Sequence, residues 1–323
     1  MAEPEIGNRQ SAIDNALVEC VPNFSEGRKP QTIDRLVEAI RSVATACVLD
    51  THIDPDHNRS VITFVASAEM VVEAAVRAVS TAAELIDMRT HQGVHPRLGA
   101  TDVLPFVPIR GLSLADCATL AHQAGQRIAA ELGIPVFFYE RAALLAERLN
   151  LEDVRRGALE LLREQIATEA SRAPDVGPLQ VHERAGAIAV GARPFLIAFN
   201  VNLKTNDIAV AKTIARAIRA RHGGLPYLKA LGFELLTRGI VQVSMNLVNY
   251  ETTGMTHAYE AVRREAERAG AEIVSTEIVG LVPENALDRS AGYFEKLENF
   301  SEDKILENRL RACAVFKSER PQV

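Results

Sequence analysis

The chain has 323 residues, a length typical of two domains of roughly 100–200 residues each. Its formal net charge of -6, with no basic run, argues against nucleic-acid binding. Hydrophobic residues make up 47% of the chain, but no apolar run is long enough to span a membrane and the acidic N-terminus lacks the pattern of a signal peptide, so we expect no membrane association.

The first half of the chain carries a β-α-β-β-α-β pattern after a tail, residues 1–16, that we expect to be disordered. In its first helix, Ile33, Leu36, Ile40 and Val43 recur at the helical period. The predicted elements are, in chain order, strand 17–24, helix 30–43, strands 46–50 and 60–65, helix 67–88 and strand 102–107.

The same order returns in the second half, after a helical connection. The connection is predicted as helix 113–132, strand 135–139 and helix 142–170. The second set is predicted as strand 195–203, helix 207–221, strands 228–236 and 240–248, helix 253–269 and strand 273–282, followed by terminal helices.

This repeated order predicts an α+β fold of two ferredoxin-like sandwiches that arose by internal duplication. Each sandwich packs two helices on one face of a sheet. The segment 173–178, which contains two prolines and a glycine, interrupts the helical pattern. We therefore expect an N-terminal subdomain over 17–180 and a C-terminal subdomain over 181–323.

The four cysteines are Cys20, Cys47, Cys117 and Cys313, and they form no Cys-x-x-Cys pair. Cysteines in apolar surroundings are usually buried thiols with no role in chemistry. We therefore predict reduced cysteines and a cytoplasmic protein.

A loop rich in histidine, 91–102, connects a helix to a strand and could carry acid–base chemistry. His91, His95 and Arg97 lie in it, with Pro96 stiffening the chain directly after His95. The same composition also fits a connection whose histidines are solvated. The histidines are not spaced as metal ligands on a helix, so we expect no metal site.

Polar side chains follow the strands of both halves. Asn23 ends the first strand, and Asn200 and Asn202 share one face of a later strand because they are two residues apart. Gln242, Ser244 and Asn246 repeat this pattern in another strand. An amide-rich face on an apolar sheet predicts a polar ligand, although a polar turn also explains Asn23.

Long motifs in this sequence resemble the formiminotransferase family. They are Glu19-Cys-Val-Pro-Asn-Phe-Ser-Glu-Gly27, His95-Pro-Arg-Leu-Gly-Ala-Thr-Asp102, and Val190-Gly-Ala-Arg193 with Leu196-Ile-Ala-Phe-Asn-Val-Asn-Leu203. The resemblance implies two related subdomains with a folate site between them, a homodimer, and transfer of the formimino group of N-formimino-L-glutamate to tetrahydrofolate as co-substrate. It also implies that a separate protein supplies cyclodeaminase activity.

The resemblance assigns roles to particular residues. It makes His95 the acid–base catalyst, and we expect Arg97 to anchor a carboxylate and Asp102 to orient a donor. The implied folate-binding stretch consists of Gly177, Pro178, Leu179, Gln180, Val181, His182, Glu183, Arg184, Ala185 and Gly186. Further expected binding residues are Asn23, Arg59, Arg193, Asn200, Asn202 and Lys204, of which the three basic residues are candidates for the glutamate tail of folate.

Val94 departs from the family pattern, in which a glutamate often precedes the catalytic histidine. The missing carboxylate removes a charge partner of His95 and affects its pKa. Two alternatives therefore stay open. The chain could transfer a formyl or another one-carbon group on the same scaffold, or it could be a folate-binding sensor without catalytic activity.

Overall fold

The computed structural model describes residues 16–55, 57–93 and 96–313, which fall into two compact units, 1–193 and 194–323. The division lies C-terminal to the expected break at residue 180, because a strand formed by Ile188–Ala192 joins the sheet of unit 1. The expected tail lies outside the described residues except for Ala16, which is buried and whose carbonyl accepts a hydrogen bond from the amide of Ala68.

Unit 1 is built on one mixed sheet. Its strands are β1 (Leu17–Cys20), β2 (Asn23–Phe24), β3 (Cys47–Asp54), β4 (Arg59–Ser67), β5 (Thr101–Arg110), β6 (Val136–Glu140) and β7 (Ile188–Ala192). The order across the sheet is β3, β4, the β1–β2 pair, β5, β7 and β6. The first members pair antiparallel, whereas β7 pairs parallel to both β5 and β6.

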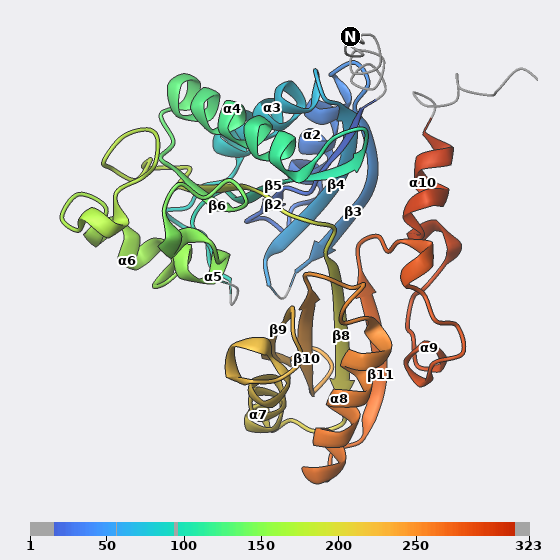
Figure 1. The fold of residues 1–323 in the computed structure, drawn as a ribbon. Helices are drawn as coiled ribbons and strands as arrows, with labels where there is room; N and C mark the ends of the chain where they lie inside the picture. Colours follow the sequence, from blue (N-terminus) through green and yellow to red (C-terminus); the bar gives the residue numbers. More distant parts are fainter. Residues whose placement is uncertain (1–15, 56, 94–95, 314–323) are drawn as a thin grey trace, which may run out of the picture. The chain divides into compact units, whose positions relative to one another are not determined.

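Three amphipathic helices cover one face of this sheet (Figure 1). They are α2 (Pro30–Arg41), α3 (Val71–Leu85) and α4 (Leu114–Leu132). In α2, Ile33, Leu36 and Ile40 turn a continuous apolar stripe toward the sheet. These helices agree with the predicted ones to within a few residues at each end.

The expected helix over 142–170 is wrong, because the chain forms three short pieces there. These are η1 (Ala146–Arg148), α5 (Leu151–Val154) and α6 (Ala158–Gln165). Gly157 and Ala158 have φ values of +77° and +52°, which a continuing right-handed helix cannot accommodate. An ion pair of 2.6 Å between Arg148 and Asp175, both nearly fully buried, holds the segment to the rest of the unit.

Unit 2 has a four-stranded antiparallel sheet with its own apolar core. The elements are β8 (Ile197–Leu203), α7 (Ile208–Ile218), β9 (Leu228–Leu235), β10 (Ile240–Leu247), α8 (Met255–Arg268) and β11 (Ile273–Val279). The sheet order is β11, β8, β10, β9. Two short helices follow, α9 (Gly292–Glu295) and α10 (Leu306–Ala312).

The cysteine prediction is only half right. Cys20 and Cys117 are free and buried. Cys47 and Cys313 are disulfide-bonded, so the prediction of reduced thiols is wrong for these two.

Within the described residues, no helix combines the length and the apolar character needed to cross a bilayer.

Candidate active site

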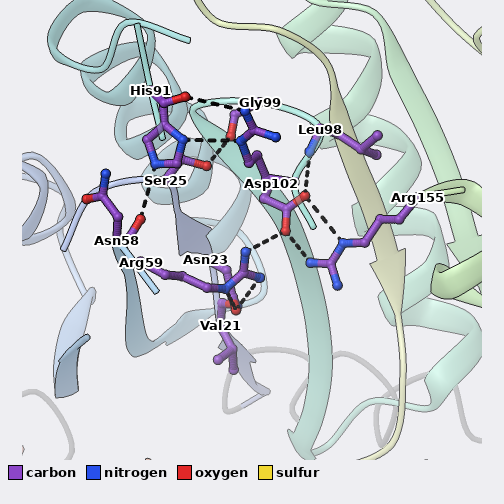
Figure 2. A network of polar contacts seen from close by, with 11 residues as sticks. Val21, Asn23, Ser25, Asn58, Arg59, His91, Leu98, Gly99, Asp102 and Arg155 are labelled. Atoms are coloured by element: carbon purple, nitrogen blue, oxygen red, sulfur yellow. Dashed lines mark hydrogen bonds and ion pairs between the residues drawn. The ribbon is translucent and has the colours of Figure 1, made fainter. Parts of the chain in front are cut away.

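Asp102 is the centre of a buried polar network in unit 1 (Figure 2). Its Oδ2 accepts a hydrogen bond of 2.7 Å from Arg59 Nη1 and a contact from Arg155 Nη2. Its Oδ1 accepts bonds from the amide of Leu98, at 2.9 Å, and from Arg155 Nε, at 3.3 Å. One carboxylate therefore faces two guanidinium groups, and the three groups together carry a net positive charge that suits an anion.

Asn23 extends the network to a neighbouring strand. Because β2 pairs with both β4 and β5, Asn23 lies beside Arg59. Its Oδ1 accepts bonds of 2.8 Å and 3.2 Å from Arg59 Nη2 and Nε, and its Nδ2 donates to the carbonyl of Val21 at 2.8 Å. Each of the two guanidinium groups still has N–H groups that reach no acceptor among the described residues.

Burial and charge act in opposite directions on Arg59. Desolvation lowers the pKa of its guanidinium, and the nearby carboxylate of Asp102 raises it. An arginine pKa starts so far above neutrality that the group stays charged. The network is therefore cationic at physiological pH.

His91 fixes the start of the histidine loop. Its Nδ1 accepts a bond of 3.2 Å from Arg97 Nε, so its Nε2 carries the proton and donates to the carbonyl of Asn58 at 3.2 Å. Burial lowers the pKa of His91, and the charge of Arg97 lowers it further, which together favour the neutral ring. Asn58 also bonds to the carbonyl of Gln92 and to the amide of Gly27, so the loop is tied to the β3–β4 turn.

The end of the loop is fixed by backbone contacts. Gly99 and Gly186 form a β-bridge, and the amide of Ala187 donates to the carbonyl of Leu98 at 2.9 Å. Ser25 Oγ donates to the carbonyl of Gly99 at 2.7 Å. His95, the predicted catalyst, and Val94 lie outside the described residues, between two segments that are both anchored.

The predicted folate-binding stretch, 177–186, packs its C-terminal part against this loop. His182 and Gly186 exchange two backbone bonds of 3.0 Å and 2.9 Å, and His182 Nδ1 accepts from the amide of Ala185 at 2.9 Å. The result is a tight turn with exposed residues at 183 and 184, preceded by an exposed run, 177–180. The structure therefore brings the end of this stretch, Ala185 and Gly186, against Gly99 and Ala100 of the histidine loop.

The other predicted basic residues make contacts of their own. Arg97 already holds a carboxylate, because its Nη2 and Nη1 bond to Glu160 at 2.7 Å and 3.1 Å. Lys204 pairs with Glu272 at 3.2 Å on an exposed surface of unit 2, where such pairs contribute little. Arg193 follows β7, and its amide donates to the carbonyl of Phe106.

Unit 2 contributes a polar face on its own sheet. Phe199 and Val201 of β8 face the helices, so Asn200 and Asn202 face the other way. Asn202 accepts a bond from Gln242 and donates one to Ser275, both of 3.0 Å. Asn200 donates to Glu277 at 3.2 Å, but its buried Oδ1 has no hydrogen-bond partner among the described residues.

Sequence reasoning missed two charged residues of unit 1, Arg155 and Glu19. Arg155 lies in a segment with many charged residues, and nothing in the helical pattern distinguishes it from the other arginines there. It is also 53 positions from its partner Asp102. Glu19 was quoted only as part of the motif 19–27. The signal that could have identified it is an acidic residue inside a predicted strand of an otherwise apolar sheet.

Among the described residues, no group of three or more His, Cys, Asp or Glu side chains is arranged to hold a metal ion.

The fold and the described contacts define a protein of two α/β units with a buried cationic network beside a histidine loop, and comparisons with known proteins give its family. A model described as the formiminotransferase domain, N-terminal subdomain, matches residues 17–193, and one described as the formiminotransferase domain matches residues 198–315. The chain belongs to the formiminotransferase family.

Named relatives agree with this assignment. A glutamate formimidoyltransferase of Thermoplasma acidophilum is 49% identical over 93% of this chain and 99% of its own length, and one of Streptococcus pyogenes serotype M1 is 46% identical over 91% and 98%. The formimidoyltransferase-cyclodeaminase of Rattus norvegicus is 42% identical over 91% of this chain and 56% of its own length. Among solved structures, a microcompartment protein from Desulfitobacterium hafniense matches 81% of this chain and 93% of its own chain, but a TM-score of 0.20 and 8% identity do not indicate a shared fold.

Proposed function

We propose that this protein is a glutamate formimidoyltransferase, which transfers the formimino group of N-formimino-L-glutamate to tetrahydrofolate and releases L-glutamate. Its family and the names of its relatives support this activity. The observation that carries the proposal is the cationic network of Asp102, Arg59 and Arg155 directly beside the loop 91–99, because both substrates carry carboxylates that need such a partner.

The reaction requires one proton to move between two nitrogen atoms. N5 of tetrahydrofolate attacks the formimino carbon and loses its proton, and the bond from that carbon to the glutamate nitrogen breaks while this nitrogen gains a proton. A group that titrates near neutrality can accept the first proton and return the second. His95 is the proposed group, and the proposal is supported by its place in a loop whose described residues on either side, 91–93 and 96–99, are held by hydrogen bonds.

Asp102 orients the two guanidinium groups, which have N–H donors available for substrate carboxylates. The proposed folate-binding residues are Asn23, Arg59, Arg193, Asn200, Asn202, Lys204 and the stretch 177–186. Arg97 is proposed to act through the loop rather than on substrate, because Glu160 occupies its guanidinium. Holding two substrates in place lowers the barrier by up to roughly 7–11 kcal/mol.

The finer architecture is part of the same proposal. In each unit, the strand order places the fourth strand of the βαββαβ set beside the first, then the third and second, which supports two ferredoxin-like sandwiches related by duplication. We also infer a cytoplasmic homodimer that works with a separate cyclodeaminase. Relatives whose names join both activities support the link to a cyclodeaminase.

An absorbance assay for 5-formimino- or 5,10-methenyl-tetrahydrofolate tests the proposal directly. The purified protein is expected to transfer from formiminoglutamate, and His95→Ala is expected to lose at least 100-fold in kcat at saturating substrates, since acid–base catalysis contributes roughly 10²–10⁴-fold. Near-normal turnover of this variant would remove His95 from the mechanism.

The rates of transfer from formiminoglutamate and from N-formylglutamate are then compared, because Val94 leaves the identity of the donor open. Faster transfer from N-formylglutamate would identify a formyltransferase, and tight folate binding without transfer from either donor would identify a sensor.

A further inference from the structure

Glu19 has a buried carboxyl in β1, which lies between β4 and β5 as does β2, the strand that contains Asn23. It lies in β1, directly between Val65 of β4 and Val107 of β5, and is only 2% exposed. Val18 and Cys20 on either side of it belong to the core under the helices. Because side chains alternate along a strand, Glu19 points to the opposite face of the sheet.

This carboxyl accepts no hydrogen bond from any residue that the structure describes. The contrast with Asp102 is sharp, because Asp102 accepts bonds from two arginines and an amide. Burying a polar group without a partner is unfavourable, and native proteins rarely do so without a functional reason. The missing partner of Glu19 is therefore expected to come from a bound molecule.

The electrostatic surroundings connect Glu19 to the cationic network. Arg193 is the charged group that acts on Glu19, and it also acts on the buried phenol of Tyr139. Arg155, a member of the Asp102 network, acts on Tyr139 as well. The charge of Arg193 thus reaches both Glu19 and Tyr139, and the charge of Arg155, which contacts Asp102, reaches Tyr139 as well.

The chemistry of the donor indicates what Glu19 binds. A formimino group attached to nitrogen is an amidine, which is a strong base and is a planar cation with N–H donors at neutral pH. A carboxylate accepts two parallel bonds from such a cation, as it does from arginine. The Asp102 carboxylate is already occupied by arginines, so Glu19 is the carboxylate with open acceptor positions.

We propose that Glu19 binds the amidinium of the formimino donor and thereby makes the site selective for a formimino group over a formyl group. This inference rests on the proposed function. The neutral formyl amide has an oxygen in place of one N–H donor, so it would present a lone pair to the carboxylate and be repelled. Selectivity by charge would also compensate for the carboxylate that Val94 does not supply.

Binding without turnover tests the assignment in the full-length protein. We expect calorimetry to show that Glu19→Gln weakens the binding of formiminoglutamate roughly 10- to 100-fold, because it removes a charge-assisted pair. The affinity for N-formylglutamate is expected to stay the same or rise, because Glu19→Gln removes a repulsive charge rather than a partner. Glu38→Gln, the same change at an exposed position of α2, is the matched control and leaves both affinities intact.

A pH series gives a second readout. Burial raises the pKa of Glu19 to about 7, and the charge of Arg193 opposes this shift. Below that pH the carboxyl is protonated, so binding of formiminoglutamate by the wild type is expected to weaken up to about tenfold per pH unit as the pH falls. Burial raises the pKa of Tyr139 further above this range, so its phenol stays neutral. Binding by Glu19→Gln is expected to stay flat.

The results that would contradict this proposal differ from the one that would contradict the proposed function. Equal weakening of both donors in Glu19→Gln, or unchanged affinity for formiminoglutamate, would overturn the proposal. If Glu19→Gln does not fold, as judged by its thermal unfolding, Glu19→Asp keeps the charge on a shorter side chain and must retain the preference for the formimino donor. Absence of transfer by the wild type would instead contradict the proposed function, which the binding measurements do not depend on.

Discussion

At the scale of single residues, the candidate site depends on one carboxylate, that of Asp102, which is the counter-charge of two arginines. Asp102 is fully buried with two arginines and one amide on its two oxygens. A buried ion pair adds little net stability compared with apolar residues, but removal of one member leaves the others without a counter-charge. The charge of Asp102 is therefore expected to be necessary for keeping both arginines buried.

Asp102→Asn tests this reasoning. The amide keeps the shape of the side chain but removes the negative charge, so two buried guanidinium groups lose their partner. We expect the free energy of unfolding to fall by about 3–5 kcal/mol, as measured by urea denaturation.

The matched control is Asp34→Asn on an exposed position of α2, which is expected to change the free energy of unfolding by less than about 0.5 kcal/mol. Equal effects of the two variants would mean that Arg59 and Arg155 do not need the charge of Asp102.

At the scale of elements, regular periodicity was predictable and long-range pairing was not. The apolar stripes of α2 and α8 identify these helices, because local spacing determines them. The strand β3 runs on to Asp54, beyond its predicted end at residue 50, because pairing with β4 extends it through polar residues. Likewise, the loop 91–102 and Asn23 could be selected from the sequence, whereas the contact of Arg155 with Asp102 depends on tertiary structure.

The bridge between Gly99 and Gly186 is an element-level feature with a measurable consequence. A Cβ added at Gly99 would lie 2.2 Å from the carbonyl oxygen of Ala187 and 2.4 Å from that of Ala185. Backbone atoms cannot move aside as a flexible side chain can. Gly99→Ala is therefore expected to lower the free energy of unfolding by about 1–3 kcal/mol and to reduce kcat, because the strain displaces the histidine loop.

Gly254→Ala is the comparison, since a Cβ there meets only the carbonyl oxygen of Tyr250, at 3.4 Å. Urea denaturation and the transfer assay of both variants provide the measurement. A Gly99→Ala protein as stable and active as Gly254→Ala would show that the loop adapts to the extra atom.

At the scale of the whole molecule, the proposed folate residues belong to two units that each have their own core. Unit 1 offers cationic groups around Asp102, and unit 2 offers the amide-lined face that contains Asn200, whose buried Oδ1 is an open acceptor. A folate molecule carries both carboxylates and ring N–H donors, so each unit offers groups that match a part of it.

Hydrogen exchange in the presence of a folate identifies the unit that binds it. The probe is 5-formyltetrahydrofolate, in which an oxygen replaces the imino nitrogen of the product. At a ligand concentration 100 times Kd, exchange should slow by about 100-fold in the unit that binds, measured at backbone amides in 98–102 for unit 1 and in 198–202 for unit 2, because binding stabilises the closed state by about 2.7 kcal/mol. Asn200→Ala is expected to weaken binding, whereas Lys212→Ala, on the exposed side of α7, is not. Protection confined to unit 1 would assign folate to that unit alone and leave the polar face of unit 2 for another ligand.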